Sequence, residues 1–228
     1  MATVDVLIPT CRRKTGLAVV LASLFGQTFT DFNVFISDQT PDDETYLDSI
    51  EIRTLLDALR WRGHRVETHR HLPRRGMAEQ RHFLLSLSRA PFAHFLDDDV
   101  LLDPQTMERM LTVIRREKCG FVGAAASGLD YLRDVRPDEQ RIELWEGPIQ
   151  PEPFVPGDLP FDRHKVNNAA NALHLERQLV KSGEIVRYKV AWVGGANLLF
   201  DRQKLLDVGG IRFWNRLPPQ HAGEGVVV

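Results

Sequence analysis

The chain has 228 residues, of which 43% are hydrophobic and 26% charged, and its 29 Lys and Arg against 31 Asp and Glu give a formal net charge of −2 at pH 7. This length is enough to bury the core of one α/β domain, and the near-neutral charge argues against nucleic acid or an anionic membrane as the partner. The two cysteines, Cys11 and Cys119, show no disulfide framework and no zinc-type pairing. No stretch resembles a signal peptide or is long enough to cross a bilayer, so we expect a cytoplasmic enzyme whose membrane attachment, if any, is peripheral.

The first hundred residues alternate strand-like runs with helical periodicity. This alternation predicts βαβ units and a Rossmann-like, mainly parallel sheet flanked by helices. Strands are predicted at residues 4–8, 32–37, 66–69 and 92–96. Apolar residues at helical spacing predict helices over residues 17–24, 46–59 and 77–87. Because ligands of open parallel sheets bind beyond the carboxyl ends of the strands, we expect the polar loops that follow the strands to form one site.

The fourth predicted strand ends in three consecutive acids, Asp97, Asp98 and Asp99. Adjacent carboxylates repel one another, so this placement is costly unless a cation neutralises them. Oxygen ligands suit Mg²⁺ or Mn²⁺, which usually bind one or two carboxylates while substrate phosphates complete the shell. The alternative is a solvated acidic turn before a helix that starts at Asp103 and Pro104.

The second half of the chain is less regular. Prolines and charged residues crowd residues 130–162, which predicts a loop or ordered excursion beside the site. A helix is predicted over 166–181 and a strand over 188–193, followed by a glycine-containing stretch at 194–197. The glycines would let the backbone approach a ligand closely, and a hairpin or bulge is an equal alternative. No heptad or apolar stripe predicts an oligomeric state.

Other classes of site fit the sequence less well. His64, His69 and His71 lie close in sequence, but no cysteine pair or helical histidine pair accompanies them as in a zinc site. The first strand is not followed by the GxxxxGK[ST] loop of P-loop proteins. A sugar-nucleotide nucleotidyltransferase would share the class and the metal, but its Gly-rich start is absent, and an aspartyl phosphatase would place its acids after the first strand.

Segments in order along the chain resemble the family 2 glycosyltransferases of GT-A fold, over nearly the whole length. The matching segments are VLIPT at 6–10 with the arginines that follow, LASLFGQT at 21–28 with FISD at 35–38, GMAEQR at 76–81, and FLDDD at 95–99. The last is similar to the family's metal-binding acidic motif. The resemblance implies one catalytic domain over 1–228, with a nucleotide-sugar half in 1–103 and an acceptor half in 104–228.

The same resemblance implies a hexosyltransferase-type activity that depends on Mn²⁺ or Mg²⁺. It would transfer a sugar from a nucleotide-diphospho-sugar to an unknown hydroxyl acceptor. Inversion at the sugar carbon is what the family implies, and a UDP-sugar is favoured over a GDP-sugar. The implied donor-binding residues are Pro9, Thr10, Arg12, Asp38, Arg75, Gly76, Arg81, Asp97 and Asp98. The implied metal ligands are Asp99 and Asp97. The implied acceptor residues are Trp192, Gly194, Gly195 and Asn197.

Some of these residues could have a structural role instead of a role in binding. A carboxylate such as Asp38 can accept the imide proton of uracil, and guanidinium groups suit a diphosphate. Arg75 and Arg81 could equally be ordinary surface arginines, and Trp192 could be part of the core rather than a platform for a sugar.

Sugar transfer also needs a general base for the acceptor hydroxyl. Relatives carry a Glu-Asp pair near the end of the domain, and here Glu224 is followed by Gly225. Glu224, or else His221, is the expected base. The alternative is a nucleotide-sugar-binding protein with little or no turnover, because Gly225 replaces the Asp. The apolar ending at 226–228 leads us to expect a shortened C-terminus.

Overall fold

The structure is a computed structural model that describes residues 1–124 and 193–216. Residues 1–124 and 195–228 form one compact unit and residues 125–194 a second one. The loop, helix and strand predicted between residues 130 and 192 lie outside the described residues, as do Trp192, His221, Glu224 and Gly225. The single catalytic domain expected over 1–228 stays a prediction.

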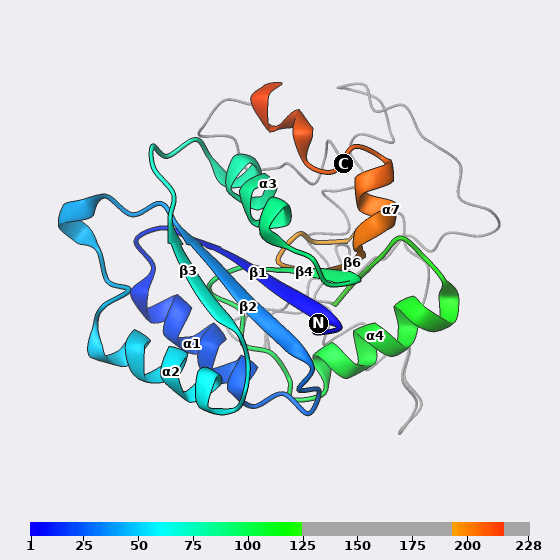
Figure 1. The fold of residues 1–228 in the computed structure, drawn as a ribbon, viewed down its shortest axis with the longest axis horizontal. Coiled ribbons are helices and arrows are strands. Elements are labelled where there is room, and N and C mark those ends of the chain that lie inside the picture. The colour runs from blue at the N-terminus through cyan, green and yellow to red at the C-terminus, as the bar shows by residue number, and fades with distance from the viewer. Residues whose placement is uncertain (125–192, 217–228) are drawn as a thin grey trace, which may run out of the picture. The chain divides into compact units, whose positions relative to one another are not determined.

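The described residues form a six-stranded sheet in the order β3-β2-β1-β4-β6-β5 (Figure 1). β1 to β4 are parallel, whereas β6 runs antiparallel to β4 and β5 antiparallel to β6. The strands are β1 (Val4–Thr10), β2 (Phe32–Asp38), β3 (Val66–Arg70), β4 (Phe92–Leu96), β5 (Phe121–Gly123) and β6 (Asn197–Asp201). The mainly parallel α/β sheet predicted from the sequence is confirmed.

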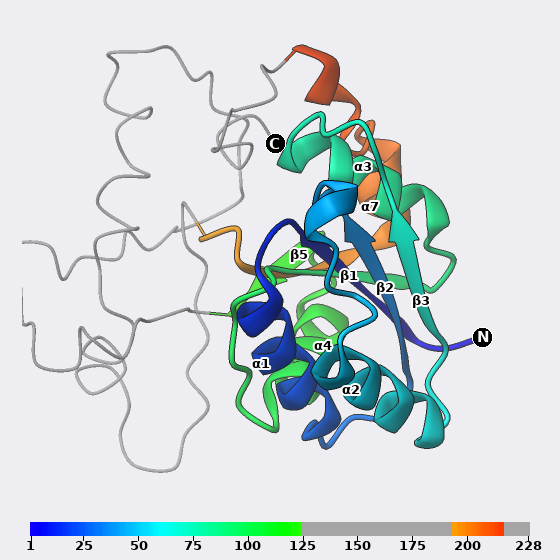
Figure 2. The same ribbon diagram turned by 90° about the vertical axis from the view of Figure 1, so that its left-hand side faces the viewer.

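Helices cover both faces of this sheet (Figure 2). α1, α2 and α4 pack on one face, and α3 and α7 pack on the other. The helices are α1 (Lys14–Phe25), α2 (Ile50–Trp61), α3 (Met77–Leu87), α4 (Thr106–Glu117) and α7 (Arg202–Asp207), with short 3₁₀ turns η1 (Asp42–Glu44) and η3 (Arg212–Arg216). No helix in the part of the chain that the structure describes is long and apolar enough to span a membrane.

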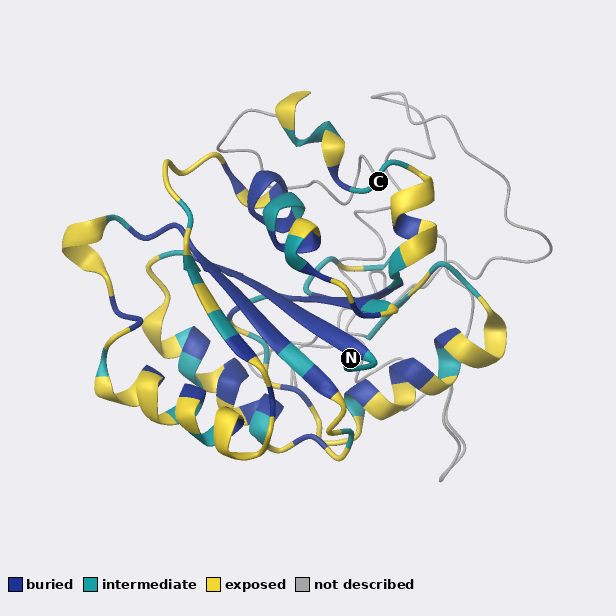
Figure 3. Cartoon of the chain, viewed as in Figure 1, coloured by how far each residue is buried: buried dark blue, intermediate teal, exposed yellow. Residues whose placement is uncertain are grey.

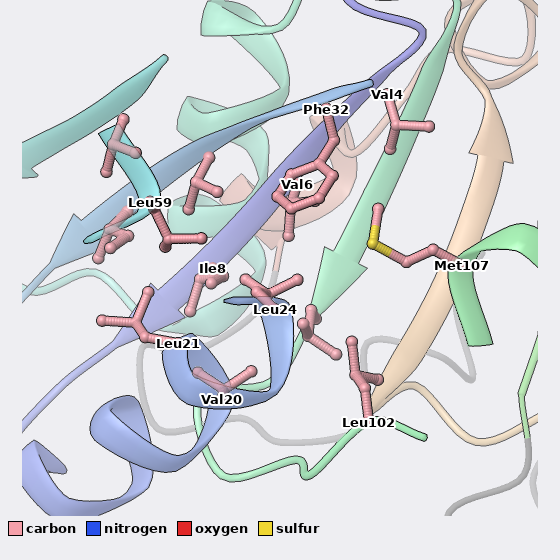
Figure 4. Packing of buried hydrophobic residues seen from close by; sticks show 14 of the residues in the cluster. Val4, Val6, Ile8, Val20, Leu21, Leu24, Phe32, Leu59, Leu102 and Met107 are labelled. Atoms are coloured by element: carbon pink, nitrogen blue, oxygen red, sulfur yellow. The ribbon is translucent and has the colours of Figure 1, made fainter. Parts of the chain in front are cut away.

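The core follows the alternation of side chains along the strands. Val4, Val6 and Ile8 of β1 point to the face covered by α1, α2 and α4 (Figure 4), while Leu7 points to the face covered by α3. All seven residues of β1 are buried, and the surface helices expose their outer sides (Figure 3). Each fully buried aliphatic side chain contributes about 1.5–3 kcal/mol, so this double-sided core fixes where the strands end.

One predicted helix begins later than expected. The apolar spacing predicted a helix over 46–59, but α2 starts at Ile50. Tyr46 and Leu47 are buried outside any helix. Tyr46 instead reaches the end of β1, where its hydroxyl lies 2.6 Å from the Thr10 Oγ1. The prediction was wrong here because burial by a distant contact produces the same apolar pattern as a helix face.

Candidate active site

The carboxyl ends of the central strands lie side by side at one edge of the sheet. Thr10 at the end of β1 is in register with Asp38 at the end of β2, and Leu96 at the end of β4 is in register with Asn197 at the start of β6. Strand order reverses about β1, with β2 on one side and β4 on the other. That reversal is the place where open α/β sheets bind ligands. The structure therefore brings the predicted donor residues of three loops to one edge.

Asp98 is the buried member of the acidic triplet, with 6% of its surface exposed. Thr10 Oγ1 donates a hydrogen bond to Asp98 Oδ2 at 2.6 Å, and the Tyr46 hydroxyl lies 2.6 Å from the same Thr10 oxygen. Since the Thr10 proton goes to Asp98, Tyr46 donates to Thr10. Burial raises the pKa of Asp98 to about 6, against the Thr10 hydrogen bond and the nearby Arg13, which lower it. This chain fixes the orientation of the Asp98 carboxylate.

Arginines pair with the other two acids of the triplet. Arg81 Nη2 donates to Asp97 Oδ1 at 2.7 Å and to the Gly195 carbonyl oxygen at 3.1 Å. Arg13 Nη1 contacts Asp99 Oδ2 and lies 3.6 Å from Asp98 Oδ1. The repulsion within the triplet that the sequence predicts is thus relieved by cations of the chain itself. Arg81 remains a predicted diphosphate ligand, although its guanidinium is directed at Asp97 and Gly195.

The acidic triplet also fits a divalent cation. Within residues 1–124 and 193–216, no three His, Cys, Asp or Glu side chains converge to hold a metal on their own. Mg²⁺ and Mn²⁺ do not need such a cage, because one or two carboxylates suffice when substrate phosphates supply the remaining oxygens. The Asp99 side chain is 51% exposed, against 27% for Asp97 and 8% for Asp98, and a guanidinium already occupies its oxygen. Asp99 is therefore the carboxylate best placed to meet an incoming cation.

The start of α1 packs directly against the acidic loop. A Cβ atom added at Gly16 would lie 2.9 Å from the Asp98 carbonyl oxygen and 3.3 Å from the Asp99 Cβ. Real Cβ atoms essentially never approach a backbone oxygen so closely. Gly16 therefore lets the first turn of α1, which carries Arg13 at its cap, lie against the triplet. The sequence analysis did not single out Gly16 or Arg13 for this role.

Asp38 lies at the predicted strand end, but its carboxylate is completely buried. Its Oδ1 accepts hydrogen bonds from the Thr40 backbone N at 2.8 Å and from the Thr40 Oγ1 at 2.5 Å. Its Oδ2 pairs with Arg70, which also reaches Asp42 at 2.8 Å. In this structure Asp38 holds the loop after β2 together, and its contact with a nucleobase stays a prediction. Arg70, which the sequence analysis missed, links the ends of β2 and β3.

A pocket of about 620 Å³ opens between the loops that follow β1, β2 and β3. Its lining residues are Arg12, Gln39, Pro41, Asp42, Leu72, Pro73 and Arg74. Arg12 enters this loop with a φ of 59°, and its guanidinium binds Glu44 at 2.5 and 3.0 Å. Gln39, which lines the pocket, donates from Nε2 to the Glu79 carboxylate at 3.2 Å. The same carboxylate lies 2.8 Å from His71 Nε2. The sequence placed Arg12 here but gave no sign of this buried carboxylate.

The remaining predicted residues belong partly to the first unit and partly to the second. Pro9 pairs with Ser37 inside the sheet, and Gly76, with a φ of 101°, precedes α3 directly after Arg75. Gly194 belongs to the second unit. The roles predicted for these residues, as for Trp192 and Glu224, stay predictions.

Asn197 faces the interior of the first unit. It is 4% exposed, and its Oδ1 lies 2.6 Å from His94 Nε2. Burial lowers the pKa of His94 to about 4, although the hydrogen bond to Asn197 acts in the other direction. A contact between Asn197 and an acceptor remains a prediction, since the amide oxygen is engaged with His94.

The acidic loop lies beside the point where strand order reverses in a mainly parallel sheet, which is where open α/β folds bind their ligands. The family model described as glycosyl transferase family 2 matches residues 5–167. The chain therefore belongs to glycosyl transferase family 2, and its fold is of the GT-A type. A search among curated proteins gave no match.

Solved structures agree with this fold. One similar structure is the mannosyltransferase PcManGT from Pyrobaculum calidifontis in complex with GDP-Man and Mn²⁺, with 14% identity and a TM-score of 0.59 over 99% of this chain and 50% of that one. Another is S. aureus TarS 1-349, with 15% identity and a TM-score of 0.58 over 99% of this chain and 53% of that one. The chain thus spans about half the length of these two proteins. Identities this low show the fold alone.

Proposed function

We propose that this protein transfers a sugar from a nucleotide-diphospho-sugar to an acceptor hydroxyl, with the donor bound at the edge formed by β1, β2 and β4. Family membership supports glycosyl transfer in general. The observation that carries the finer proposal is the arrangement of Asp98 and Asp99. The Asp98 carboxylate accepts a hydrogen bond from Thr10. The neighbouring Asp99 is exposed and pairs with the guanidinium of Arg13.

Each acid of the triplet has its own proposed role in binding the metal and the donor. Asp99 is the proposed ligand for Mn²⁺ or Mg²⁺, with Asp97 beside it and steadied by Arg81. When bound, such an ion neutralises the negative charge that develops on the departing nucleotide diphosphate. Asp98, fixed by Thr10, is oriented for the ribose or for a share of the ion. The structure of PcManGT is a complex with GDP-Man and Mn²⁺, which supports a divalent ion beside the donor here.

The nucleobase is proposed to enter the pocket between the loops after β1, β2 and β3. The pocket wall carries the Asp42 carboxylate, which is 87% exposed and can accept a hydrogen bond from a ring N–H. Uracil and guanine both present such an N–H, whereas the ring nitrogens of adenine only accept. We propose a UDP-sugar first and a GDP-sugar second.

Glu224 is the proposed general base and inversion the proposed outcome, with the reaction taking place in the cytoplasm. The competing proposal, a donor-binding protein without efficient turnover, is favoured by one specific observation, the glycine at position 225. Restoring the acid with Gly225→Asp should raise turnover sharply if a missing base limits the reaction. If Gly225→Asp changes nothing and Glu224→Ala abolishes turnover, Glu224 is the base.

Release of UDP or GDP from a panel of nucleotide sugars tests the proposal. Turnover should require Mn²⁺ or Mg²⁺, stop in EDTA, and be lost in Asp99→Asn. The matched control is Asp57→Asn, which removes another exposed acid that pairs with an arginine, Arg60, on α2. Turnover that persists in EDTA, or that Asp99→Asn leaves intact, would refute the metal site.

A further inference from the structure

Among the described residues, Arg13 and Asp99 form the one ion pair of the acidic triplet in which both side chains are exposed to solvent. The Arg13 side chain is 57% exposed and the Asp99 side chain 51%. By contrast, the Arg81 side chain that pairs with Asp97 is only 8% exposed, and Asp98 is buried on Thr10. Exposed ion pairs contribute little net free energy, so a divalent ion can displace Arg13 far more easily than it can displace Arg81.

We propose that Arg13 is an exchangeable ligand of the donor site: it neutralises Asp99 in the free protein and turns to the nucleotide's phosphates once a divalent ion takes that carboxylate. This inference rests on the proposed function and assigns to Arg13 a role in donor binding. A guanidinium and a divalent ion compete for the same Asp99 oxygen because both are positive and a carboxylate has few free positions.

The start of α1 keeps the displaced guanidinium close to the site. The backbone N of Leu17 donates to the Arg13 carbonyl oxygen at 2.9 Å, which fixes Arg13 to the first helical turn. Gly16 in the same turn packs against the Asp98 carbonyl oxygen. Arg13 therefore cannot move far when its side chain leaves Asp99. Phosphate oxygens held near that carboxylate are suitable partners, because the planar guanidinium binds them with two parallel hydrogen bonds.

Arg12 and Lys14, on either side of Arg13, are engaged elsewhere. Arg12 binds Glu44 through two nitrogens, and Lys14 Nζ lies 3.0 Å from Glu51. Only Arg13 among these three consecutive cations reaches the triplet in the structure. The geometry therefore predicts that metal and nucleotide bind cooperatively, because each one alone leaves a charge unpaired that the other would satisfy.

The test separates metal binding from nucleotide binding. Mn²⁺ binding without nucleotide is followed by the electron paramagnetic resonance signal of the free ion, and UDP binding by calorimetry in Mn²⁺ and in EDTA. Arg13→Ala should tighten Mn²⁺ binding without nucleotide by about 2–5-fold, the range expected on removing an exposed competing pair. It should weaken UDP binding in Mn²⁺ by about 10-fold or more, the usual effect of losing a charged hydrogen bond.

Two further variants sharpen the result. Arg13→Lys keeps the positive charge and should fall between the wild type and Arg13→Ala in both measurements. Lys14→Ala, the matched control, removes the adjacent cation, which pairs with Glu51, and should leave both affinities unchanged. The inference is overturned if Arg13→Ala does not tighten Mn²⁺ binding, or if it weakens UDP binding equally with and without Mn²⁺. If wild type shows no Mn²⁺-dependent UDP binding at all, the proposed function itself fails, and the inference falls with it.

Discussion

Acidification should destabilise the fold through His94. This histidine is 1% exposed in β4, where it is in register with Val6 of β1 and Leu199 of β6. Its Nε2 donates to Asn197 Oδ1 at 2.6 Å, and its Nδ1 is buried without a hydrogen-bond partner. Protonation of Nδ1 would place a charge between two strands with nothing to solvate it. Burial accordingly lowers the pKa of His94 to about 4, from 6.5 for an exposed histidine.

The sign of the effect follows from proton binding. Below pH 6.5 the unfolded chain takes up a proton at His94, whereas the folded chain does not do so until about pH 4. The contribution of neutral His94 to the free energy of unfolding is therefore fully present above pH 6.5. It is lost as the pH falls from 6.5 to 4. At 1.36 kcal/mol for each pKa unit, the full loss is about 3 kcal/mol, and about 2 kcal/mol of it falls between pH 7 and pH 4.5.

Urea denaturation at pH 7, 5.5 and 4.5 measures this loss in wild type and in His94→Gln. Glutamine can still donate to Asn197 but does not titrate, so groups that titrate in both proteins, Asp98 among them, cancel in the comparison. We expect His94→Gln to be less stable at pH 7, because it disturbs the packing. Its stability deficit should shrink by about 2 kcal/mol on going to pH 4.5. A deficit that stays constant with pH would refute the argument from burial.

Other predictions test the site and the core. Gly16→Ala should destabilise the protein in urea by about 1 kcal/mol or more, since the added Cβ meets the Asp98 carbonyl oxygen at 2.9 Å and overpacking exceeds the gain in helix propensity. Gly26→Ala, whose added Cβ has no neighbour closer than 3.5 Å, should cost nothing, and equal losses in both variants would count against the close contact. Thr10→Val should weaken Mn²⁺-dependent UDP binding by about 10-fold, because Asp98 loses its buried hydrogen bond, and unchanged binding would exclude that role. Leu21→Ala, at a fully buried position of α1, should cost about 2–5 kcal/mol by urea denaturation, and a loss under 1 kcal/mol would contradict the packing described.

The four parallel strands β1 to β4 were predicted from the sequence, whereas their order in the sheet was not. Apolar runs that end in Thr10, Asp38 and Asp97 specify where buried strands stop, because a buried strand cannot continue into charged residues without cost. The right-handed crossovers of βαβ units then place these ends on one edge. This is why the sequence predicted that the loops after these strands lie close together.

The ion pairs between the arginines and the acidic triplet could not be predicted from the sequence. The sequence predicted that a cation neutralises the acidic triplet and favoured a divalent ion; in the structure Arg13 and Arg81 pair with Asp99 and Asp97, and metal binding stays a prediction. Which arginine reaches which acid depends on how closely α1 and α3 approach the loop after β4. Residue types alone do not encode that approach. The exposed surface arginine that the sequence allowed for at position 81 is in fact a buried one.

The partners of buried polar residues were also not predictable from the sequence. Tyr46 was assigned to a helix face, yet it supports Thr10 from a loop. Nothing in the sequence indicated that the Asp38 oxygens bind Thr40 and Arg70, and the predicted contact of Asp38 with a nucleobase stays a prediction. A polar side chain at a strand end has the same signature in the sequence whether it binds a ligand or closes a loop, and only its partners distinguish the two.

Calorimetric titration of the protein with UDP, with and without Mn²⁺ and with GDP and ATP as controls, tests the central claim most directly. We predict binding of UDP that depends on Mn²⁺, weaker binding of GDP and the weakest binding of ATP. Tighter binding of GDP would move the donor to a GDP-sugar and leave the site in place. The absence of binding by either UDP or GDP in Mn²⁺ would contradict the account, because the acidic triplet would then be a structural turn held by its arginines.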